Sequence, residues 1–470
     1  MPATPSATAI DELHFRLRGG LYGPDDPEYA DACTLFNSAV DRRPLLVARC
    51  AAPDDVIAAL AFAREHHLPV AVRGGGHSVT GRSLCDGLVL DMRGMRDVEV
   101  DPDARIARIG GGATWADVDR ATGAHGLATT GGRVSTTGVA GLTMGGGSGW
   151  LERKHGLACD NLVAADVVTA DGDLVRVSET ENPDLLWALR GGGANFGVVT
   201  SLELRLHPLE REILAGLVLH PAERAQDALR LFRDLMLDAP EELGLAFAYI
   251  TAPEEPDVPA ELHNKPAVMI AGMYAGPVAE GERVLRPLRE FGPPAADFFE
   301  PTTYAEFQCS IDDPPGYRNY WTAENLDSLP DEAIEAIDRR AAELPAGPSQ
   351  IFIVPWGGAV ARADAESSPL AGREARFVVH PLLLWENATD DERMVALGRA
   401  FREDLAPYAS GAAYLNFLGD EGAARVRAGF TEGSFERLTR VKATWDPRNV
   451  FEGNQALGPA ALRSREATLS

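Results

Sequence analysis

The stretch VRGGGHSV, residues 72–79, places three consecutive glycines directly before a histidine. Glycine loses more conformational freedom on folding than any other residue, so such a run is informative where the backbone itself has a task. The residues before it predict a helix over 53–67, opening with Asp54 and Asp55, and then a buried strand, LPVAV. This order leaves backbone N–H groups free to converge on an anion, with His77 at the end of the loop. A plain turn is the alternative explanation.

Composition excludes several classes of partner. The chain has 470 residues, enough for two or three domains with a buried ligand, and its net charge of −26 argues against nucleic acid or an anionic membrane. Its five cysteines are widely spaced, without a CxxC pair or a zinc spacing, so we expect no metal site and a reducing compartment. The N-terminal residues lack the charged start and apolar core of a secretory signal, and no apolar run approaches a membrane span. We therefore expect a soluble, cytoplasmic protein.

Common nucleotide-binding and hydrolase motifs are missing from the sequence. No Lys follows a Gly, which removes the Walker A loop, and GxGxxG, GxSxG and HExxH do not occur. The glycine loops need another explanation.

The pattern of elements changes near residue 211. Residues 69–206 hold short strand-like runs, a hairpin signal at Asp171-Gly172 and two helices, which predicts an α+β domain with mixed sheets. Longer helices and the strands IFIVPW and RFVVHPLLLW follow. We expect a first domain over 1–210, with its core at about 40–210, a second over 211–425, and a C-terminal segment over 426–470.

A second glycine-rich stretch, GGRVSTTGVAGLTMGGGSG, spans residues 131–149, and Arg133 is its one charged residue. Such a composition is poor for a core but suits a buried loop whose amides and hydroxyls bind a large polar cofactor. A third run, RGGGANFGVV at 190–199, again leads into a strand. Three such loops in one domain favour a cofactor site over a purely structural explanation.

Five ordered motifs carry a family resemblance: RGGGHSV, GVAGLTMGGGSGWLERKHGLACDNL, LLWALRGGGANFGVVTSLELRL, YLNFLGDEG and DPRNVFEGNQ. From about residue 40 to the end, the chain resembles the berberine bridge enzyme-like flavoprotein oxidases of the vanillyl-alcohol oxidase/p-cresol methylhydroxylase superfamily. The resemblance implies an α+β, two-domain fold of the p-cresol methylhydroxylase type. In that fold the first domain binds FAD, an antiparallel sheet in the second covers the flavin, and the C-terminal segment returns to the first domain.

The same resemblance assigns the cofactor contacts. His77, as neutral imidazole, would bond covalently to the 8α carbon of FAD, while Gly74, Gly75 and Gly76 would cradle the pyrophosphate. A turn histidine with its hydrogen bonds satisfied is the alternative for His77. The complete set of expected cofactor-binding residues is Arg73, Gly74, Gly75, Gly76, His77, Ser78, Thr136, Thr137, Gly138, Gly141, Gly145, Gly146, Gly147, Gly149, Trp150, Asn161, Val198, Tyr414, Asn416 and Asn454.

Departures from the family pattern change the expectations. Val134 stands where many relatives carry a second flavin-linking Cys, so we expect a single covalent bond. Ser148 stands where several plant relatives place an active-site Tyr. AYLNFL is interpreted as a strand of the covering sheet, with Tyr414 and Asn416 on one face and Phe417 on the other.

Three further residues are candidates for chemistry. His380 is the polar exception in the strand RFVVHPLLLW, although a lone buried His is more often a satisfied core residue. Glu152 and Tyr320 are weaker candidates, since Glu152 can pair with a neighbouring Arg or Lys and Tyr320 can simply pack. The segment SSPLAGR replaces the His-Arg ending of several bacterial relatives, so substrate choice cannot be transferred from them.

The sequence therefore predicts an FAD-dependent oxidase acting on a small organic substrate. A hydride from a C–H next to oxygen or nitrogen would pass to flavin N5, a residue from the covering domain would take the proton, and O₂ would become H₂O₂. Tyr414 is the first choice as base, His380 the second and Glu152 the third catalytic candidate. A dehydrogenase using a quinone or protein acceptor, and a flavin-binding protein without turnover, are the alternatives.

Overall fold

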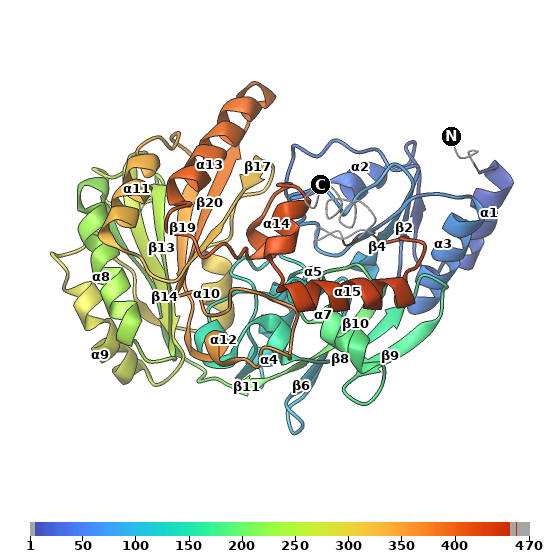
Figure 1. The fold of residues 1–470 in the computed structure, drawn as a ribbon, viewed down its shortest axis with the longest axis horizontal. Helices are drawn as coiled ribbons and strands as arrows, with labels where there is room; N and C mark the ends of the chain where they lie inside the picture. The colour runs from blue at the N-terminus through green and yellow to red at the C-terminus, as the bar shows by residue number, and fades with distance from the viewer. Residues whose placement is uncertain (1–4, 452–456, 458–470) are drawn as a thin grey trace.

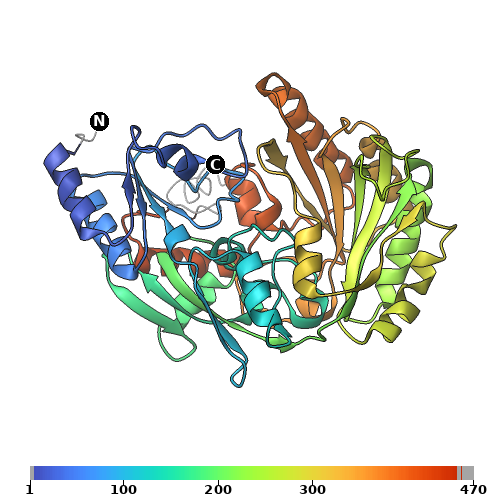
Figure 2. The same ribbon diagram turned by 180° about the vertical axis from the view of Figure 1, so that it is seen from behind.

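The computed structural model describes residues 5–451 and 457, and the chain forms two halves (Figure 1). The first half contains a four-stranded sheet, a five-stranded sheet and a two-stranded pair of β7 (Leu127–Ala128) and β11 (His207–Pro208), and the second is built on one nine-stranded sheet. Figure 2 shows from behind that the nine-stranded sheet stands beside the first half, with helices on its outer side. This arrangement leaves one face of the large sheet turned toward the first half.

The four-stranded sheet begins the first half, in the order β1-β2-β4-β3. Strands β2, β4 and β3 run parallel, β1 pairs antiparallel with β2, and apolar side chains from α3 (Pro53–Glu65) pack against the sheet. Parallel strands need cover on both faces, which explains their nearly continuous apolar sequences. The helix expected over 53–67 ends two residues earlier. The strands and the other helices here are β1 Leu21–Tyr22, β2 Leu46–Arg49, β3 Val70–Arg73, β4 Leu88–Asp91, α1 Ala7–Arg16 and α2 Tyr29–Cys33.

The five-stranded sheet is antiparallel and has the order β5-β6-β10-β8-β9. Asp171-Gly172 lies in the turn between β8 and β9, where Gly172 adopts φ +89° as the hairpin signal requires. Asn182 precedes the next helix but does not cap it with its side chain, which donates instead to the carbonyl oxygen of Arg176 (2.7 Å). The elements are β5 Val98–Asp101, β6 Ile106–Gly110, α4 Trp115–Gly123, β7 Leu127–Ala128, α5 Val139–Met144, α6 Glu152–His155, β8 Leu162–Val168, β9 Leu174–Ser178, α7 Pro183–Leu189, β10 Val198–Arg205 and β11 His207–Pro208.

The nine-stranded sheet follows the order β15-β12-β14-β13-β19-β20-β17. In addition, β16 pairs with β12 and β18 pairs with β20. Its strands are β12 Ile213–Pro221, β13 Leu243–Thr251, β14 Pro266–Tyr274, β15 Ala296–Asp297, β16 Glu300–Thr302, β17 Arg318–Trp321, β18 Glu324–Leu326, β19 Gln350–Pro355 and β20 Phe377–Trp385.

Helices cover one face of this sheet, and strand alternation decides which side chains they meet. Ile351 and Ile353 of β19 pack in the cluster under the helices, whereas Gln350 and Phe352 point to the opposite face. The helices of this half are α8 Ala225–Asp238, α9 Val278–Arg289, α10 Tyr304–Ser310, α11 Asp331–Ala341, α12 Gly358–Arg362 and α13 Asp391–Leu405.

The last helices lead the chain back to the first half. After α14 (Ala423–Ala428), helix α15 (Glu432–Trp445) runs along the first half beside α7 (Figure 1). The buried Lys442 of α15 donates to the carbonyl oxygen of Asn195 (2.7 Å) and pairs with Asp446 (2.7 Å). These contacts anchor the returning segment beside the third glycine run.

The expected strand AYLNFL is wrong. Leu415–Phe417 form a 3₁₀ turn, in which the N–H of Phe417 bonds to the carbonyl oxygen of Tyr414 (3.1 Å). A 3₁₀ turn has three residues per turn, so side chains three positions apart lie on the same side. The rings of Tyr414 and Phe417 therefore meet edge to face, with centroids 4.8 Å apart, instead of pointing to opposite faces.

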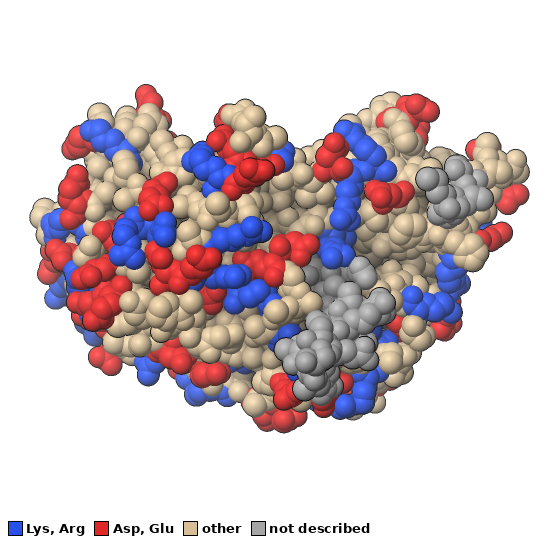
Figure 3. Space-filling model, turned by 45° about the horizontal axis from the view of Figure 1, so that its top comes forward, with Lys and Arg blue, Asp and Glu red and all other residues tan. Residues whose placement is uncertain are grey.

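Within residues 5–451, no helix combines the length and apolar character needed to cross a bilayer. On the face seen in Figure 3, acidic and basic side chains alternate and do not form a continuous basic surface.

Candidate functional site

A cavity of about 270 Å³ lies between the first half and the free face of the nine-stranded sheet. The first half contributes the loop after β3 and the segment around α5, and the sheet contributes side chains of β14, β17, β19 and β20. The segment around Tyr414 forms part of the same wall. The cavity thus joins parts of the chain that are far apart in sequence.

The glycine loop presents free donors to this cavity. The N–H groups of the buried Gly76 and the half-buried Gly75 and His77 donate to no acceptor among the described residues, whereas amides away from water are normally paired. Gly75 also crosses the second glycine loop, because a Cβ placed on it would lie 2.3 Å from the backbone nitrogen of Gly138. At Gly141 a Cβ would meet only open space, so its missing side chain is part of the cavity.

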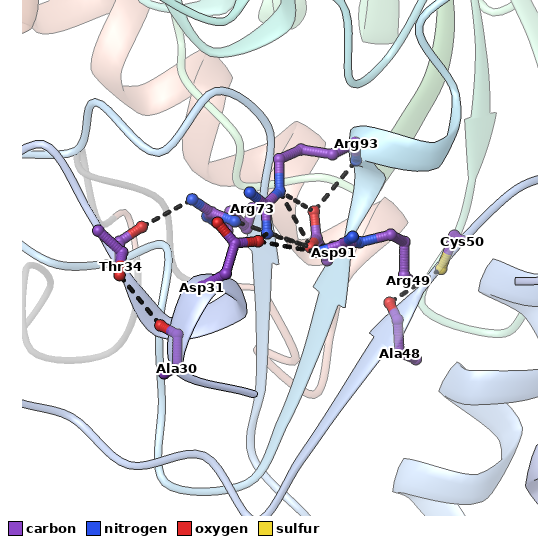
Figure 4. A network of polar contacts seen from close by, with 9 residues as sticks. All are labelled: Ala30, Asp31, Thr34, Ala48, Arg49, Cys50, Arg73, Asp91 and Arg93. Atoms are coloured by element: carbon purple, nitrogen blue, oxygen red, sulfur yellow. Dashed lines mark hydrogen bonds and ion pairs between the residues drawn. The ribbon is translucent and has the colours of Figure 1, made fainter. Parts of the chain in front are cut away.

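A buried charge network supports this loop on the side that does not line the cavity (Figure 4). Asp91 at the end of β4 is fully buried and contacts the guanidinium groups of Arg49 (3.1 Å), Arg93 (2.9 Å) and Arg73 (3.7 Å). Arg49 and Arg73 end the two strands that flank β4, directly beside Asp91. Arg73 lies beneath Gly76 and does not line the cavity, and burial lowers its pKa to about 10. Arg73 therefore supports the glycine loop from behind.

His77 lies on the cavity wall with both ring nitrogens near hydroxyl groups. Nε2 is 2.9 Å from Thr136 Oγ1, and Nδ1 is 3.4 Å from Thr137 Oγ1. Its ring stacks on Phe36, with centroids 4.4 Å apart. Burial lowers the pKa of His77 to about 4, so the imidazole is neutral at physiological pH. A neutral, oriented imidazole is the form that can act as a nucleophile.

Tyr414 lines the cavity, but its hydroxyl points into a ring of donors. The oxygen accepts from the N–H groups of Gly147 (2.9 Å) and Ser148 (2.7 Å) and from Asn416 Nδ2 (3.2 Å). Burial raises the pKa of Tyr414 well above 10, and these three donors offset only part of the rise. A phenol with a raised pKa stays protonated at neutral pH and is a poor base.

His380 also lines the cavity and keeps one nitrogen available. Its Nδ1 lies 2.8 Å from the carbonyl oxygen of Thr322; a carbonyl only accepts, so Nδ1 carries the proton. Nε2 is buried and has no partner among the described residues. The ring stacks on Phe417 (4.2 Å) and meets the edge of Trp321 (5.3 Å). Burial lowers the pKa of His380 to about 3, so the imidazole is neutral and its Nε2 keeps a free lone pair.

Glu152 is occupied elsewhere. One carboxylate oxygen accepts from Arg133 (2.7 Å), the other from the N–H of Gly149 (3.0 Å), and the side chain does not line the cavity. Arg133 does line it and lies over the ring of Trp150 (4.9 Å). Tyr320 donates to Glu421 (3.1 Å), away from the cavity.

The other expected cofactor residues divide into two groups. Those on the cavity wall are Gly74, Ser78, Thr137, Gly138 and Asn416. Those that do not line it are Thr136, Gly145, Gly146, Gly147, Gly149, Trp150, Asn161 and Val198. Asn454 lies outside the described residues.

Close packing explains several glycines of the second group. A Cβ on Gly145 would lie 1.9 Å from the side-chain oxygen of Asn416, and one on Gly146 would lie 3.0 Å from the ring of Tyr414. These glycines make room for the segment around Tyr414. The side-chain oxygen of Asn161 instead lies 2.7 Å from His207 Nε2. His207 belongs to β11, which pairs with β7.

Several residues of the site were not found from the sequence. Phe36 stacks on His77 without lining the cavity itself; it precedes the first recognisable strand, and no motif marks it. Asp313 and Gln350 line the cavity and are hydrogen-bonded to each other (2.8 Å), but they are 37 positions apart in the chain. Strand alternation in β19 indicates that Gln350 and Phe352 share one face of the sheet. Nothing in the sequence indicates whether that face is covered by helices or lines the cavity.

The chemistry of the residues that line the cavity suits FAD. Unpaired amides at a glycine loop suit a pyrophosphate, and the neutral His77 stands beside them at the wall. Val134 lines the cavity, whereas none of the five cysteines does.

Comparison with known proteins agrees with this fit. Residues 44–178 match a family model described as "FAD binding domain", and residues 413–458 match one described as "Berberine and berberine like". (R)-6-hydroxynicotine oxidase of Paenarthrobacter nicotinovorans is 31% identical over 463 residues, covering 94% of this chain and 97% of the relative. The FAD-linked oxidoreductase YgaK of Bacillus subtilis (strain 168) is 29% identical over 94% of this chain and 98% of the relative.

A solved structure gives the same result. The crystal structure of 6-hydroxy-D-nicotine oxidase from Arthrobacter nicotinovorans superposes with a TM-score of 0.84 at 28% identity, covering 94% of this chain and 98% of that chain. Fold and site together define an FAD-dependent oxidoreductase with the α+β, p-cresol methylhydroxylase-type fold. The chain belongs to the berberine bridge enzyme-like FAD-linked oxidoreductases, as its glycine and C-terminal motifs indicated.

Proposed function

We propose that this protein is an oxidase of a small organic substrate, with FAD held in the cavity by one covalent bond to His77. FAD supplies the hydride acceptor for a C–H next to oxygen or nitrogen, and O₂ takes the electrons on to H₂O₂. The 31% identical relative is named as an oxidase, which supports this choice over a dehydrogenase.

His77 has the state and position that attachment requires. Its burial keeps the ring neutral, and the hydroxyls of Thr136 and Thr137 can each donate or accept, so either ring nitrogen can carry the proton. Stacking on Phe36 fixes the plane of the ring. Val134 supplies no thiol for a second bond.

His380 is the base that we propose for the substrate proton. The residue lines the cavity, its buried Nε2 has no partner among the described residues, and the bond from Nδ1–H to Thr322 holds Nε2 in the accepting form. Tyr414, the first choice from sequence, accepts three hydrogen bonds at its oxygen and keeps its proton. We assign Tyr414 to positioning the loop at Gly147 and Ser148.

The single observation that carries the proposal is one cavity lined by a neutral, hydroxyl-contacted His77 and, on the sheet side, by His380, whose buried Nε2 has no partner among the described residues. The test is an anaerobic screen of small alcohols and amines for loss of flavin absorbance, followed by readmission of air. We expect at least one donor to reduce the flavin, and air to restore the absorbance with one H₂O₂ per donor. A donor-reduced enzyme that stays reduced in air would contradict the oxidase assignment, and bleaching by dithionite alone would contradict turnover.

A further inference from the structure

Among the described residues, Asp313 is the acidic side chain of the cavity wall, and no part of the proposed proton transfer uses it. It follows α10 in the segment SIDDPPG, and its carboxylate accepts from Gln350 Nε2 (2.8 Å) through one oxygen. The other oxygen has no hydrogen-bond partner, and no Arg or Lys pairs with the carboxylate, in the part of the chain that the structure describes. A held carboxylate with one free oxygen and no counter-charge is an incomplete ion pair.

The neighbouring carboxylate does a different task. Asp312 accepts from the N–H (2.6 Å) and the hydroxyl (2.5 Å) of Ser135, in the loop whose next residue contacts His77. Asp312 thereby ties the second half to the second glycine loop and fixes the direction of Asp313. The position of Asp313 at the cavity is therefore set from two sides, by Asp312 along the chain and by Gln350 across the site.

Asp313 and His380 can serve the same small molecule. In the register of β19 and β20, Gln350 is opposite Leu382 and Phe352 is opposite His380, and all four side chains face the cavity. Diagonal neighbours on one face of an antiparallel pair lie about 7–8 Å apart. The carboxylate that Gln350 holds is thus within a small molecule's length of the proposed base.

The wall around these groups is mainly apolar. Its apolar side chains on this side of the cavity are Met269, Ile311, Trp321, Phe352, Leu382 and Phe417. The other charged or titratable side chains that the described part of the chain places on the wall are His77, Arg82, Arg133, His380 and Tyr414. Of these, Arg133 is paired with Glu152, and burial keeps both histidines neutral.

We infer that Asp313, held by Gln350, is the specificity residue that binds the cationic nitrogen of a small amine with an apolar ring or chain. This inference rests on the proposed function, since it names the substrate class of the same cavity. The carboxylate supplies the counter-charge, and the apolar wall receives the body of the amine. A neutral alcohol of the same shape lacks the ion pair, and an acid of that shape is repelled.

The experiment measures binding to the FAD-loaded protein by calorimetry under argon, with benzylamine, benzyl alcohol and benzoate as probes. We expect benzylamine to bind more tightly than the other two, and Asp313→Asn to weaken it by about 10- to 100-fold, the range for a hydrogen bond to a charged group. Asparagine keeps an oxygen for Gln350, so the variant mainly removes charge. Asp103→Asn, the same change on an exposed turn that does not line the cavity, should leave all three affinities unchanged.

The wild-type protein provides a second test. Burial and the charge of Asp312 raise the pKa of Asp313 to about 6, so the carboxylate loses its charge as the pH falls through that value. Benzylamine stays a cation between about pH 5 and pH 8, and its affinity should fall toward the acid end of this range. The bound cation lowers the pKa of Asp313, which moves the midpoint below 6.

Two outcomes would overturn the inference: a wild-type protein without preference for the amine over the alcohol, or an Asp313→Asn protein that binds benzylamine as the wild type does. Either result leaves the flavin-reduction screen untouched. Conversely, a protein that binds amines through Asp313 but is reduced by no donor would contradict the proposed function and keep the binding assignment.

Discussion

Replacement of His380 by Asn separates the two functions of the imidazole. The Asn amide can donate to the carbonyl oxygen of Thr322, as Nδ1–H does now, but it places no lone pair at the position of Nε2. Loss of a positioned base slows a reaction by about 10²–10⁴, equivalent to about 3–5 kcal/mol of barrier. The assay is anaerobic stopped-flow reduction of the flavin by a donor found in the screen. Reoxidation by O₂ should be unchanged, because the substrate proton takes no part in it.

His380→Gln is the matched control, because its longer side chain returns a polar atom to the position of Nε2. We expect it to bind donors better than His380→Asn while reducing flavin just as slowly. Loss of the face-to-face ring contact with Phe417 costs about 1 kcal/mol of folding free energy in both variants, so thermal melting must be compared as well. Reduction of His380→Asn at the wild-type rate, with normal flavin content, would refute the role of His380 and return Tyr414 to first place.

The remaining predictions concern the supports of the site. Tyr414→Phe leaves the N–H groups of Gly147 and Ser148 without their acceptor and should cost about 1–3 kcal/mol of stability, while flavin reduction slows less than about tenfold. Asp91→Asn removes the charge that faces the buried Arg73 and should cost about 3–5 kcal/mol with lower FAD content, whereas the same change in the exposed Asp54–Arg18 pair should cost under about 1 kcal/mol. Because the pKa of His380 is lowered in the folded protein, the unfolded chain binds a proton at this residue first as the pH falls below about 6.5. At pH 5 this difference should lower the free energy of unfolding by about 2 kcal/mol. Urea melts of His380→Asn should lack that part of the acid destabilisation.

Local chemistry allowed much of this site to be predicted from the sequence. The glycine run before His77 indicated a loop with free amides, and three of its N–H groups have no acceptor among the described residues. The helix over 53–67 was right in type and nearly right in its bounds, because its apolar spacing and its proline start are local signals.

The failures have a common physical cause, which is tertiary contact. AYLNFL alternates like a strand, but the ring contacts of Tyr414 with Trp356 and Phe417 accompany a 3₁₀ turn at this place. Gly145 and Gly146 make room for the side chains of Asn416 and Tyr414, a contact that no local signal indicates. Asp313 carries no motif at all, since its neighbour Gln350 comes from a distant strand.

The central claim is that the cavity holds FAD through one bond to His77, and peptide mass spectrometry of the purified protein tests it most directly. After acid denaturation and proteolysis, the account predicts a flavin adduct on the peptide that contains His77, no adduct on the peptide that contains Val134, and release of all flavin from His77→Ala. Flavin that washes out of the wild-type protein in acid, or an adduct on any other peptide, would contradict the claim.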